Sequence, residues 1–137
     1  MERHNFKKLQ IWNDAMNLID KSYSFTGNLP ASENYGLTSQ MNRSIVSIAS
    51  NIAEGSSKSS NKHFVQFLET SLGSAFEWET QLIICKRQNY IEEEPYEDLL
   101  QDIKSIQRKI SNFIKKLKTK KSWLLTPVSC LLIPVSQ

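Results

Sequence analysis

The chain has 137 residues, of which 39% are hydrophobic and 23% are charged, a composition that indicates one soluble globular domain rather than a disordered or membrane protein. Its two cysteines, Cys85 and Cys130, form neither a disulfide framework nor a metal-binding spacing. The N-terminal residues lack the apolar segment of a signal peptide, and no apolar run reaches the ~20 residues of a membrane helix. We therefore expect a cytoplasmic protein that does not bind membranes.

Charge is distributed unevenly along the chain, although the net charge is only +3. All fourteen acidic residues lie at or before Asp102. From Ile103 onward every charged residue is basic, and the eight of them are Lys104, Arg108, Lys109, Lys115, Lys116, Lys118, Lys120 and Lys121. A basic segment of this kind can bind the phosphates of a nucleic acid, but it is also typical of a solvated helix end.

The first predicted helix covers residues 6–25. Its apolar residues are spaced by alternating three and four positions, as on the core-facing side of a helix in a bundle. They are Leu9, Trp12, Met16, Ile19 and Tyr23, and Ala15 and Leu18 broaden this side. The sequence GNLPAS at residues 27–32 then predicts a turn, because Gly and Asn tolerate left-handed conformations and Pro30 disfavours helix in the residue before it.

The second predicted helix covers residues 33–54 and has the clearest pattern. A stripe of large apolar residues marks its core-facing side: Leu37, Met41, Ile45, Ile48 and Ile52. A second set of small or apolar residues lies beside this stripe: Val46, Ala49 and Ala53. Gly55 is expected to end the helix by adopting a positive φ.

The third predicted helix covers residues 62–88, after a serine-rich connector in which Ser60 or Asn61 is expected to cap the helix. The connector hydroxyls could bind phosphate, but a plain loop is favoured. Beside the core-facing residues of this helix lies a second apolar set: Val65, Leu72, Phe76 and Ile83. The second and third helices therefore carry more apolar surface than one core requires, which predicts contacts between copies of the chain.

The fourth predicted helix covers residues 95–119, after a turn at residues 89–95. Its core-facing residues are Tyr96, Leu99, Ile103, Ile106, Ile110, Phe113 and Leu117. A basic stripe lies opposite: Lys104, Arg108, Lys115 and Lys118. Two interpretations of this basic stripe are open. Basic residues late in a helix complement the helix dipole, but a stripe without compensating acidic residues can also contact an anion.

Residues 122–137 differ from the rest of the chain, because they contain no charge. LLTPVSC at residues 124–130 is followed by the near-identical LLIPVSQ at residues 131–137. Two units cannot form a solenoid, and Pro127 and Pro134 exclude a continuous helix. We expect this tail to lie outside a four-helix domain formed by residues 1–121.

Four long amphipathic helices with short connectors predict an all-α, antiparallel up-down-up-down four-helix bundle. Three segments, followed by NYI at residues 89–91, carry a family resemblance: FKKLQIWNDAMNL at residues 6–18, LPASENYGLTSQMNRSIVSIASNIAEG at 29–55 and FVQFLETSLGSAFEWETQL at 64–82. In these segments the chain resembles the small bundle proteins encoded within intervening sequences of bacterial 23S rRNA genes. The similarity covers about residues 6–118.

This resemblance implies a homopentamer, in agreement with the surplus apolar surface. It does not establish a function, because the family is linked to rRNA chiefly by genomic location. A more distant resemblance to the basic, pentameric accessory protein of diversity-generating retroelements raises the expectation of RNA binding. The polar residues that match the family motif are expected to be structural: Gln40, Arg43, Asn51, Glu54 and Gly55.

An enzyme is disfavoured by the sequence. His4 and His63 have no cysteine or carboxylate at metal-ligand spacing, and the chain contains no glycine-rich phosphate loop or nucleophile motif, so neither a metal nor a cofactor is expected. Glu79 lies near the apolar side of the third helix and requires a cationic or hydrogen-bonded partner, for which Arg43 is a candidate. A polar cluster of these two residues with Glu54 is more consistent with a structural role than with catalysis.

Two hypotheses follow for the function. The first is an oligomer that binds RNA phosphates without reading sequence, through Lys104, Arg108, Lys115, Lys116 and Lys118, with Lys7, Lys8 and Arg87 as further candidates. The second is an oligomeric protein–protein interaction module in which the basic residues only solvate the fourth helix. A steep salt dependence of RNA binding would distinguish the first hypothesis from the second.

Overall fold

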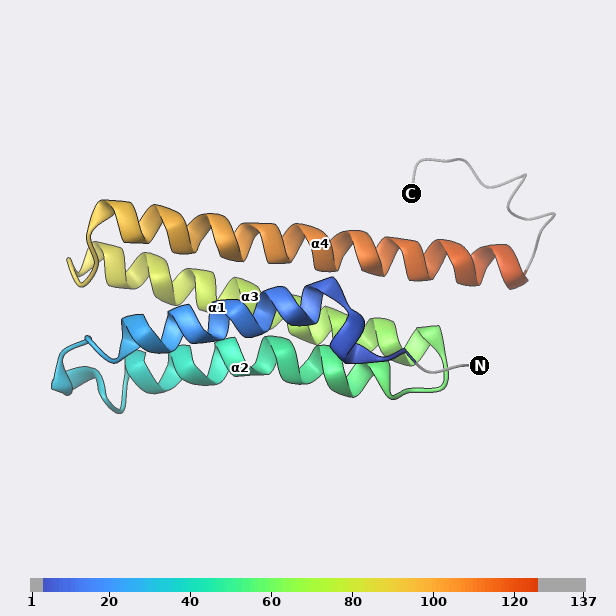
Figure 1. Cartoon of the computed structure of the whole chain (residues 1–137), viewed down its shortest axis with the longest axis horizontal. Helices are drawn as coiled ribbons and strands as arrows, with labels where there is room; N and C mark the ends of the chain where they lie inside the picture. Colours follow the sequence, from blue (N-terminus) through green and yellow to red (C-terminus); the bar gives the residue numbers. More distant parts are fainter. Residues whose placement is uncertain (1–3, 126–137) are drawn as a thin grey trace.

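The structure, a computed structural model, describes residues 4–125, and the side chains of residues 4–119. Four antiparallel helices make up most of this part of the chain: α1 (Gln10–Thr26), α2 (Leu37–Ser56), α3 (Asn61–Arg87) and α4 (Glu93–Leu125) (Figure 1). α1 packs against α2 and α4, and α3 packs against the same two helices. The predicted all-α bundle with up-down-up-down order is therefore confirmed.

Aliphatic side chains from all four helices form the core, with two aromatic residues among them. The largest fully buried side chains are Trp78, Phe64, Leu18, Met41, Ile45, Ile48, Ile52, Leu68, Leu82, Ile103, Ile106 and Ile110. Burying each large apolar side chain stabilises the fold by roughly 1.5–3 kcal/mol. The core-facing stripe predicted for residues 33–54 is confirmed. Leu37 packs against the core, and the other four members of the stripe are fully buried: Met41, Ile45, Ile48 and Ile52.

The first predicted helix is divided in two. Leu9 has extended backbone angles, φ −79° and ψ 128°, so Phe6–Lys8 form a separate 3-10 turn, η1, before α1 begins. The amide Nδ2 of Asn13 donates to the carbonyl oxygens of Lys7 and Leu9, each at 3.0 Å. The side chain of Asn13 therefore supplies hydrogen bonds to backbone carbonyls at the break.

α2 begins at Leu37, four residues later than predicted, because Ala31–Glu33 form a 3-10 turn, η2. Glu33 fixes this start, since its Oε1 accepts from the Leu37 N–H at 3.1 Å and its Oε2 accepts from the Tyr90 hydroxyl at 3.1 Å. The bond to Glu33 raises the pKa of Tyr90. Glu33 thus links the start of α2 to the turn that precedes α4.

The predicted role of Gly55 is wrong. α2 continues through Gly55 to Ser56, and no described glycine has a positive φ. A Cβ at Gly55 would lie 2.7 Å from the Cβ of Phe67 and 2.9 Å from the Cδ1 of Phe64. Glycine is required here because α3 packs too close to α2 for a side chain, and not because the helix ends.

The remaining helix ends differ from the predictions by a few residues. Ser60 caps α3 as predicted, since its hydroxyl accepts from the His63 N–H at 3.2 Å. Asn89 turns the chain with a positive φ of 62° after α3. α4 then begins at Glu93 and continues to Leu125, beyond the predicted domain limit at residue 121. The rest of the predicted tail, residues 126–137, lies outside the described residues.

Between residues 4 and 125, no helix is both long enough and apolar enough to cross a membrane.

Candidate nucleic-acid interface

The N-terminal half of α4 is acidic, and its carboxylates bind cations of neighbouring helices. Lys21 Nζ lies 2.7 Å from Asp102 and 3.4 Å from Asp98, and Lys86 Nζ lies 2.8 Å from Glu93. The hydrogen bond to Asp102 raises the pKa of Lys21, and the bond to Lys86 lowers the pKa of Glu93. These two lysines are therefore engaged within the protomer.

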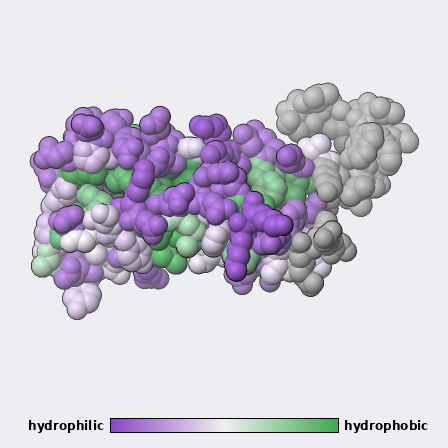
Figure 2. Space-filling view, viewed as in Figure 1, coloured by the Kyte–Doolittle hydropathy of each residue, from purple (hydrophilic) through white to green (hydrophobic). Residues whose placement is uncertain are grey.

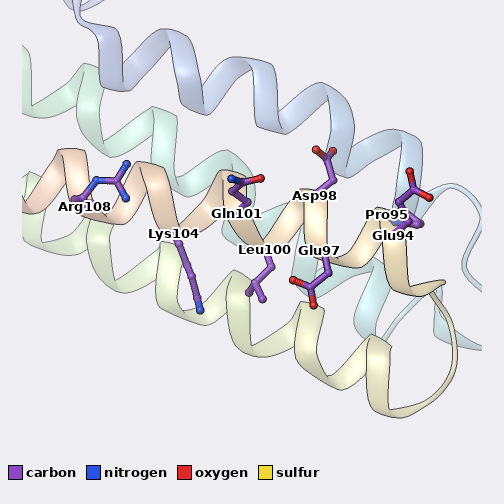
Figure 3. Close-up of a pocket in the computed structure, with 8 residues that line it drawn as sticks. All are labelled: Glu94, Pro95, Glu97, Asp98, Leu100, Gln101, Lys104 and Arg108. Atoms are coloured by element: carbon purple, nitrogen blue, oxygen red, sulfur yellow. The ribbon is translucent and has the colours of Figure 1, made fainter.

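Lys104 and Arg108 are exposed near the middle of α4. They line an open groove of about 940 Å³ together with Glu94, Glu97 and Asp98. Figure 3 shows that the two basic side chains diverge, since Lys104 extends across α3 while Arg108 points away from that helix. Lys104 and Arg108, the first two residues of the predicted stripe, therefore lie on a surface that also contains carboxylates.

The second half of the stripe is exposed as well. Lys115, Lys116 and Lys118 all project into solvent, and Lys118 lies 4.0 Å from Glu69, a distance typical of a weak surface pair. Lys116 lines a groove of about 350 Å³ between the start of α1 and α4, beside Leu9. Over residues 4–119, no carboxylate lies within 4 Å of four of the five candidates: Lys104, Arg108, Lys115 and Lys116.

The further basic candidates are separated by the fold. Lys7 and Lys8 belong to η1, which lies toward the end of the bundle that contains the C-terminal half of α4 (Figure 1). Arg87 is the last residue of α3 and lies at the opposite end, beside the start of α4. The structure therefore brings Lys7 and Lys8, but not Arg87, to the same end of the bundle as Lys115–Lys118.

The polar residues of the family motif have structural contacts of several kinds. Asn51 Nδ2 donates to the carbonyl and hydroxyl oxygens of Ser47 at 2.8 and 2.9 Å. Gln40 and Arg43 line a polar groove between α2 and α3, together with Ser44, Ser47 and Glu77. Glu54 is exposed.

Glu79 has the hydrogen-bonded partner that was expected, but the candidate Arg43 is not that partner. Glu79 Oε1 accepts instead from Gln107 Nε2 of α4, at 2.7 Å. The ring order of the bundle explains the difference, because Arg43 belongs to α2 and Glu79 lies where α3 packs against α4. The expected cluster with Glu54 does not form among the described side chains.

Most of the surplus apolar residues reach the surface. Val46 is 38% exposed and Phe76 is 52% exposed, and Ala53, Val65, Leu72 and Ile83 are half-buried. Ala49 differs, because it is 4% exposed and belongs to the protomer's own core. Hydrophilic residues cover most of the face seen in Figure 2, with apolar residues visible between them.

Two residues predicted for the core of the first helix are also on the surface. Met16 is 38% exposed and Tyr23 is 48% exposed. Leu9, Trp12 and Ile19 of the predicted seam pack against the core, and Ala15 and Leu18 are buried as predicted. The most buried side of α1 also contains Ile11, so the core-facing side is shifted away from Met16 and Tyr23.

Sequence reasoning missed a set of buried polar contacts between helices. Trp78 Nε1 donates to the hydroxyl of Ser22 at 3.0 Å, and Ser44 donates to Gln81 Oε1 at 2.7 Å. All four side chains are buried. Serines on an otherwise apolar helix side are the only signal in the sequence for these contacts. The described residues contain no group of three or more side chains that could hold a metal ion.

Residues 7–112, most of the described bundle, match the family model described as 23S rRNA-intervening sequence protein. The chain belongs to this family. A solved structure from Bacteroides thetaiotaomicron, described as a protein with unknown function from the S23 ribosomal protein family, is 27% identical to it, with a TM-score of 0.70. That alignment covers 77% of this chain and 98% of the other. A comparison with curated proteins gave no match for this member of the 23S rRNA-intervening sequence family.

Proposed function

We propose that the protein is a non-enzymatic cytoplasmic oligomer that binds RNA encoded with it, through phosphate contacts made by the basic C-terminal half of α4. Its membership of the 23S rRNA-intervening sequence family supports RNA as the ligand. The observation that carries the proposal is that Lys115, Lys116 and Lys118 are exposed and that, over residues 4–119, Lys115 and Lys116 have no carboxylate within 4 Å.

The helix dipole does not account for these cations. α4 ends at Leu125, and its last turn contains no basic residue. A helix dipole acts on charges within about the last turn. Even Lys118 is seven residues before the end of the helix, roughly 10 Å at 1.5 Å per residue. A ligand that neutralises positive charge explains the position of the lysines better than the dipole does.

The choice between lysine and arginine indicates how the RNA is held. Four of the five candidates are lysines, whose compact charge binds phosphate without the bidentate geometry that arginine offers to guanine. Contacts of this kind fix the backbone and carry no sequence information. We therefore expect strong salt dependence and little discrimination between RNA sequences.

Oligomerisation is the second part of the proposal. Exposed apolar side chains on three helices support it: Met16, Tyr23, Val46, Phe76 and Ile84. Apolar surface of this kind commonly marks an interface between proteins. It also favours the alternative function, a protein–protein interaction module whose ligand is another protein.

Fluorescence anisotropy with a labelled 23S rRNA intervening-sequence stem-loop and a scrambled RNA tests the proposal. The variant Lys115→Gln/Lys116→Gln removes two cations of this half of α4 that have no carboxylate partner over residues 4–119. Its matched control, Lys21→Gln/Lys86→Gln, removes two paired cations on other helices and the same net charge. We expect the first variant to lose most of the affinity for both RNAs and the control to retain it. Equal loss in both variants would contradict RNA binding at α4 and favour the interaction module.

A further inference from the structure

Three segments that are distant in the sequence lie at one end of the bundle. Figure 1 shows η1, the connection between α2 and α3, and the C-terminal part of α4 at the same end. Ring contacts join them, because Phe64 of α3 lies 5.5 Å from Phe113 of α4, and His4 lies 5.0 Å from Phe64 and 6.1 Å from Phe113. The up-down-up-down order of the helices causes this arrangement.

Lysine dominates the charge of these segments. We define the basic end as the seven lysines in these segments and in the first turn of α3: Lys7, Lys8, Lys58, Lys62, Lys115, Lys116 and Lys118. Two carboxylates accompany them, Glu54 and Glu69, and Glu69 lies 4.0 Å from Lys118. Six of the seven lysines have no carboxylate within 4 Å over residues 4–119.

The opposite end has the reverse charge. The turns before α2 and α4, with the first turns of α4, contain six carboxylates: Glu33, Glu92, Glu93, Glu94, Glu97 and Asp98. Three bases lie beside them, Lys21, Lys86 and Arg87, so the carboxylates remain in excess. The charge asymmetry along the sequence therefore becomes an asymmetry along the long axis of the bundle.

Lys104 and Arg108 lie between these two ends. The groove that they line also contains Glu94, Glu97 and Asp98. Lys104 is six residues from Asp98, roughly 9 Å along the helix, which is within the screening length of about 8–10 Å at physiological salt. An approaching phosphate would be repelled there by carboxylates. Lys115 and Lys116 are more than ten residues further from these acids along α4.

We propose that RNA phosphates bind at the basic end, across η1, the α2–α3 connection with the first turn of α3, and the part of α4 that contains Lys115–Lys118, and that Lys104 and Arg108 contribute little. This inference rests on the proposed function and places its site. Four packed helices make this end about 20 Å across, wide enough for the backbone of several nucleotides. Since all seven cations are lysines, the site holds the backbone without reading bases.

Two double variants with equal loss of charge test this placement. Lys8→Gln/Lys62→Gln removes two exposed lysines of the basic end that lie outside α4, and Lys104→Gln/Arg108→Gln removes two exposed cations from the middle of α4. The probe is a labelled 23S rRNA intervening-sequence stem-loop, titrated at several salt concentrations. Circular dichroism confirms that both variants are folded.

We expect the basic-end variant to bind roughly tenfold or more weakly, with a salt slope smaller by about 1.4–1.8, corresponding to two lost phosphate contacts. The central variant should stay within about twofold of the wild type. An equal or greater loss in the central variant would overturn the placement while leaving RNA binding intact. Absence of salt-dependent RNA binding by the wild-type protein would overturn both the placement and the proposed function.

Discussion

Gly55 and Phe67 approach so closely that a Cβ on Gly55 would lie 2.7 Å from the Cβ of Phe67. The atom it would meet is next to the backbone of α3, so no flexible side chain can move away. This contact sets how near α2 and α3 pack at the end of the bundle that contains the basic residues. It explains why the family-motif position is a glycine within a continuous helix.

We predict that Gly55→Ala destabilises the fold. Alanine is favoured over glycine in a helix by ~1 kcal/mol, but forcing a methyl group into a packed contact costs about 1–3 kcal/mol or more. A net loss of up to about 2 kcal/mol should appear in urea unfolding followed by circular dichroism.

Gly73→Ala is the matched control for that substitution. Gly73 also lies within a helix, but a Cβ there would have no neighbour within 4 Å. Only the gain in helix propensity remains, so the variant should be more stable by ~0.5–1 kcal/mol. A stabilised Gly55→Ala variant would show that the close contact has no energetic importance.

Ser22→Ala should destabilise the protein by removing the acceptor of the Trp78 indole N–H. Both side chains are fully buried, and a buried donor left without a partner costs about 1–3 kcal/mol. Ser71→Ala provides the comparison. Ser71 donates to the carbonyl of Ile48, which lies within α2, so this carbonyl keeps its backbone hydrogen bond when the hydroxyl is removed. Thermal unfolding should rank Ser22→Ala as the more damaging change, and the reverse order would contradict the importance of the indole contact.

Cys85 should be unreactive in the folded protein. Burial, aided by the negative charge of Glu33, raises the pKa of its thiol from 9.0 to about 11. The folded state therefore retains the proton where the unfolded state loses it, so the contribution of Cys85 to stability falls as the pH rises from about 9 to 11. In a Cys130→Ser variant, a thiol reagent at pH 8 should react only in denaturant. Rapid labelling of the native protein would contradict this environment.

Val46→Glu and Phe76→Glu test the proposed oligomer. Both residues are exposed in the protomer, so a carboxylate costs the fold little, but it would be buried in an interface formed there. Light scattering should show a smaller particle for each variant, while circular dichroism stays unchanged. Gln66→Glu, at an exposed position of α3, should leave the mass unaltered. A monomeric wild-type protein would contradict the proposal directly.

Helical periodicity was sufficient to predict four helices and most of their buried sides, because those sides follow from spacing alone. Three features depend on tertiary packing and could not be predicted this way. Close packing of α3 requires glycine at Gly55. The first helix breaks at Leu9, where Asn13 donates to backbone carbonyls, and Tyr23 follows the seam pattern but is 48% exposed.

The candidate site was predicted less completely than the fold. The sequence identifies the basic residues of α4, but it cannot show which of them share a surface with carboxylates. Lys104 and Lys115 both belong to the predicted stripe, yet only Lys104 lies in a groove with Glu97. The contribution of η1 and the α2–α3 connection depends on the antiparallel order of the helices, which brings separate lysines together (Figure 1).

The salt dependence of RNA binding tests phosphate recognition most directly. The slope of log K against log salt should be close to −0.7 to −0.9 for each phosphate contact, and the variant Lys115→Gln/Lys116→Gln/Lys118→Gln should make it shallower by about 2–3. A slope that is the same in the wild type and in this variant would contradict RNA binding through the basic half of α4.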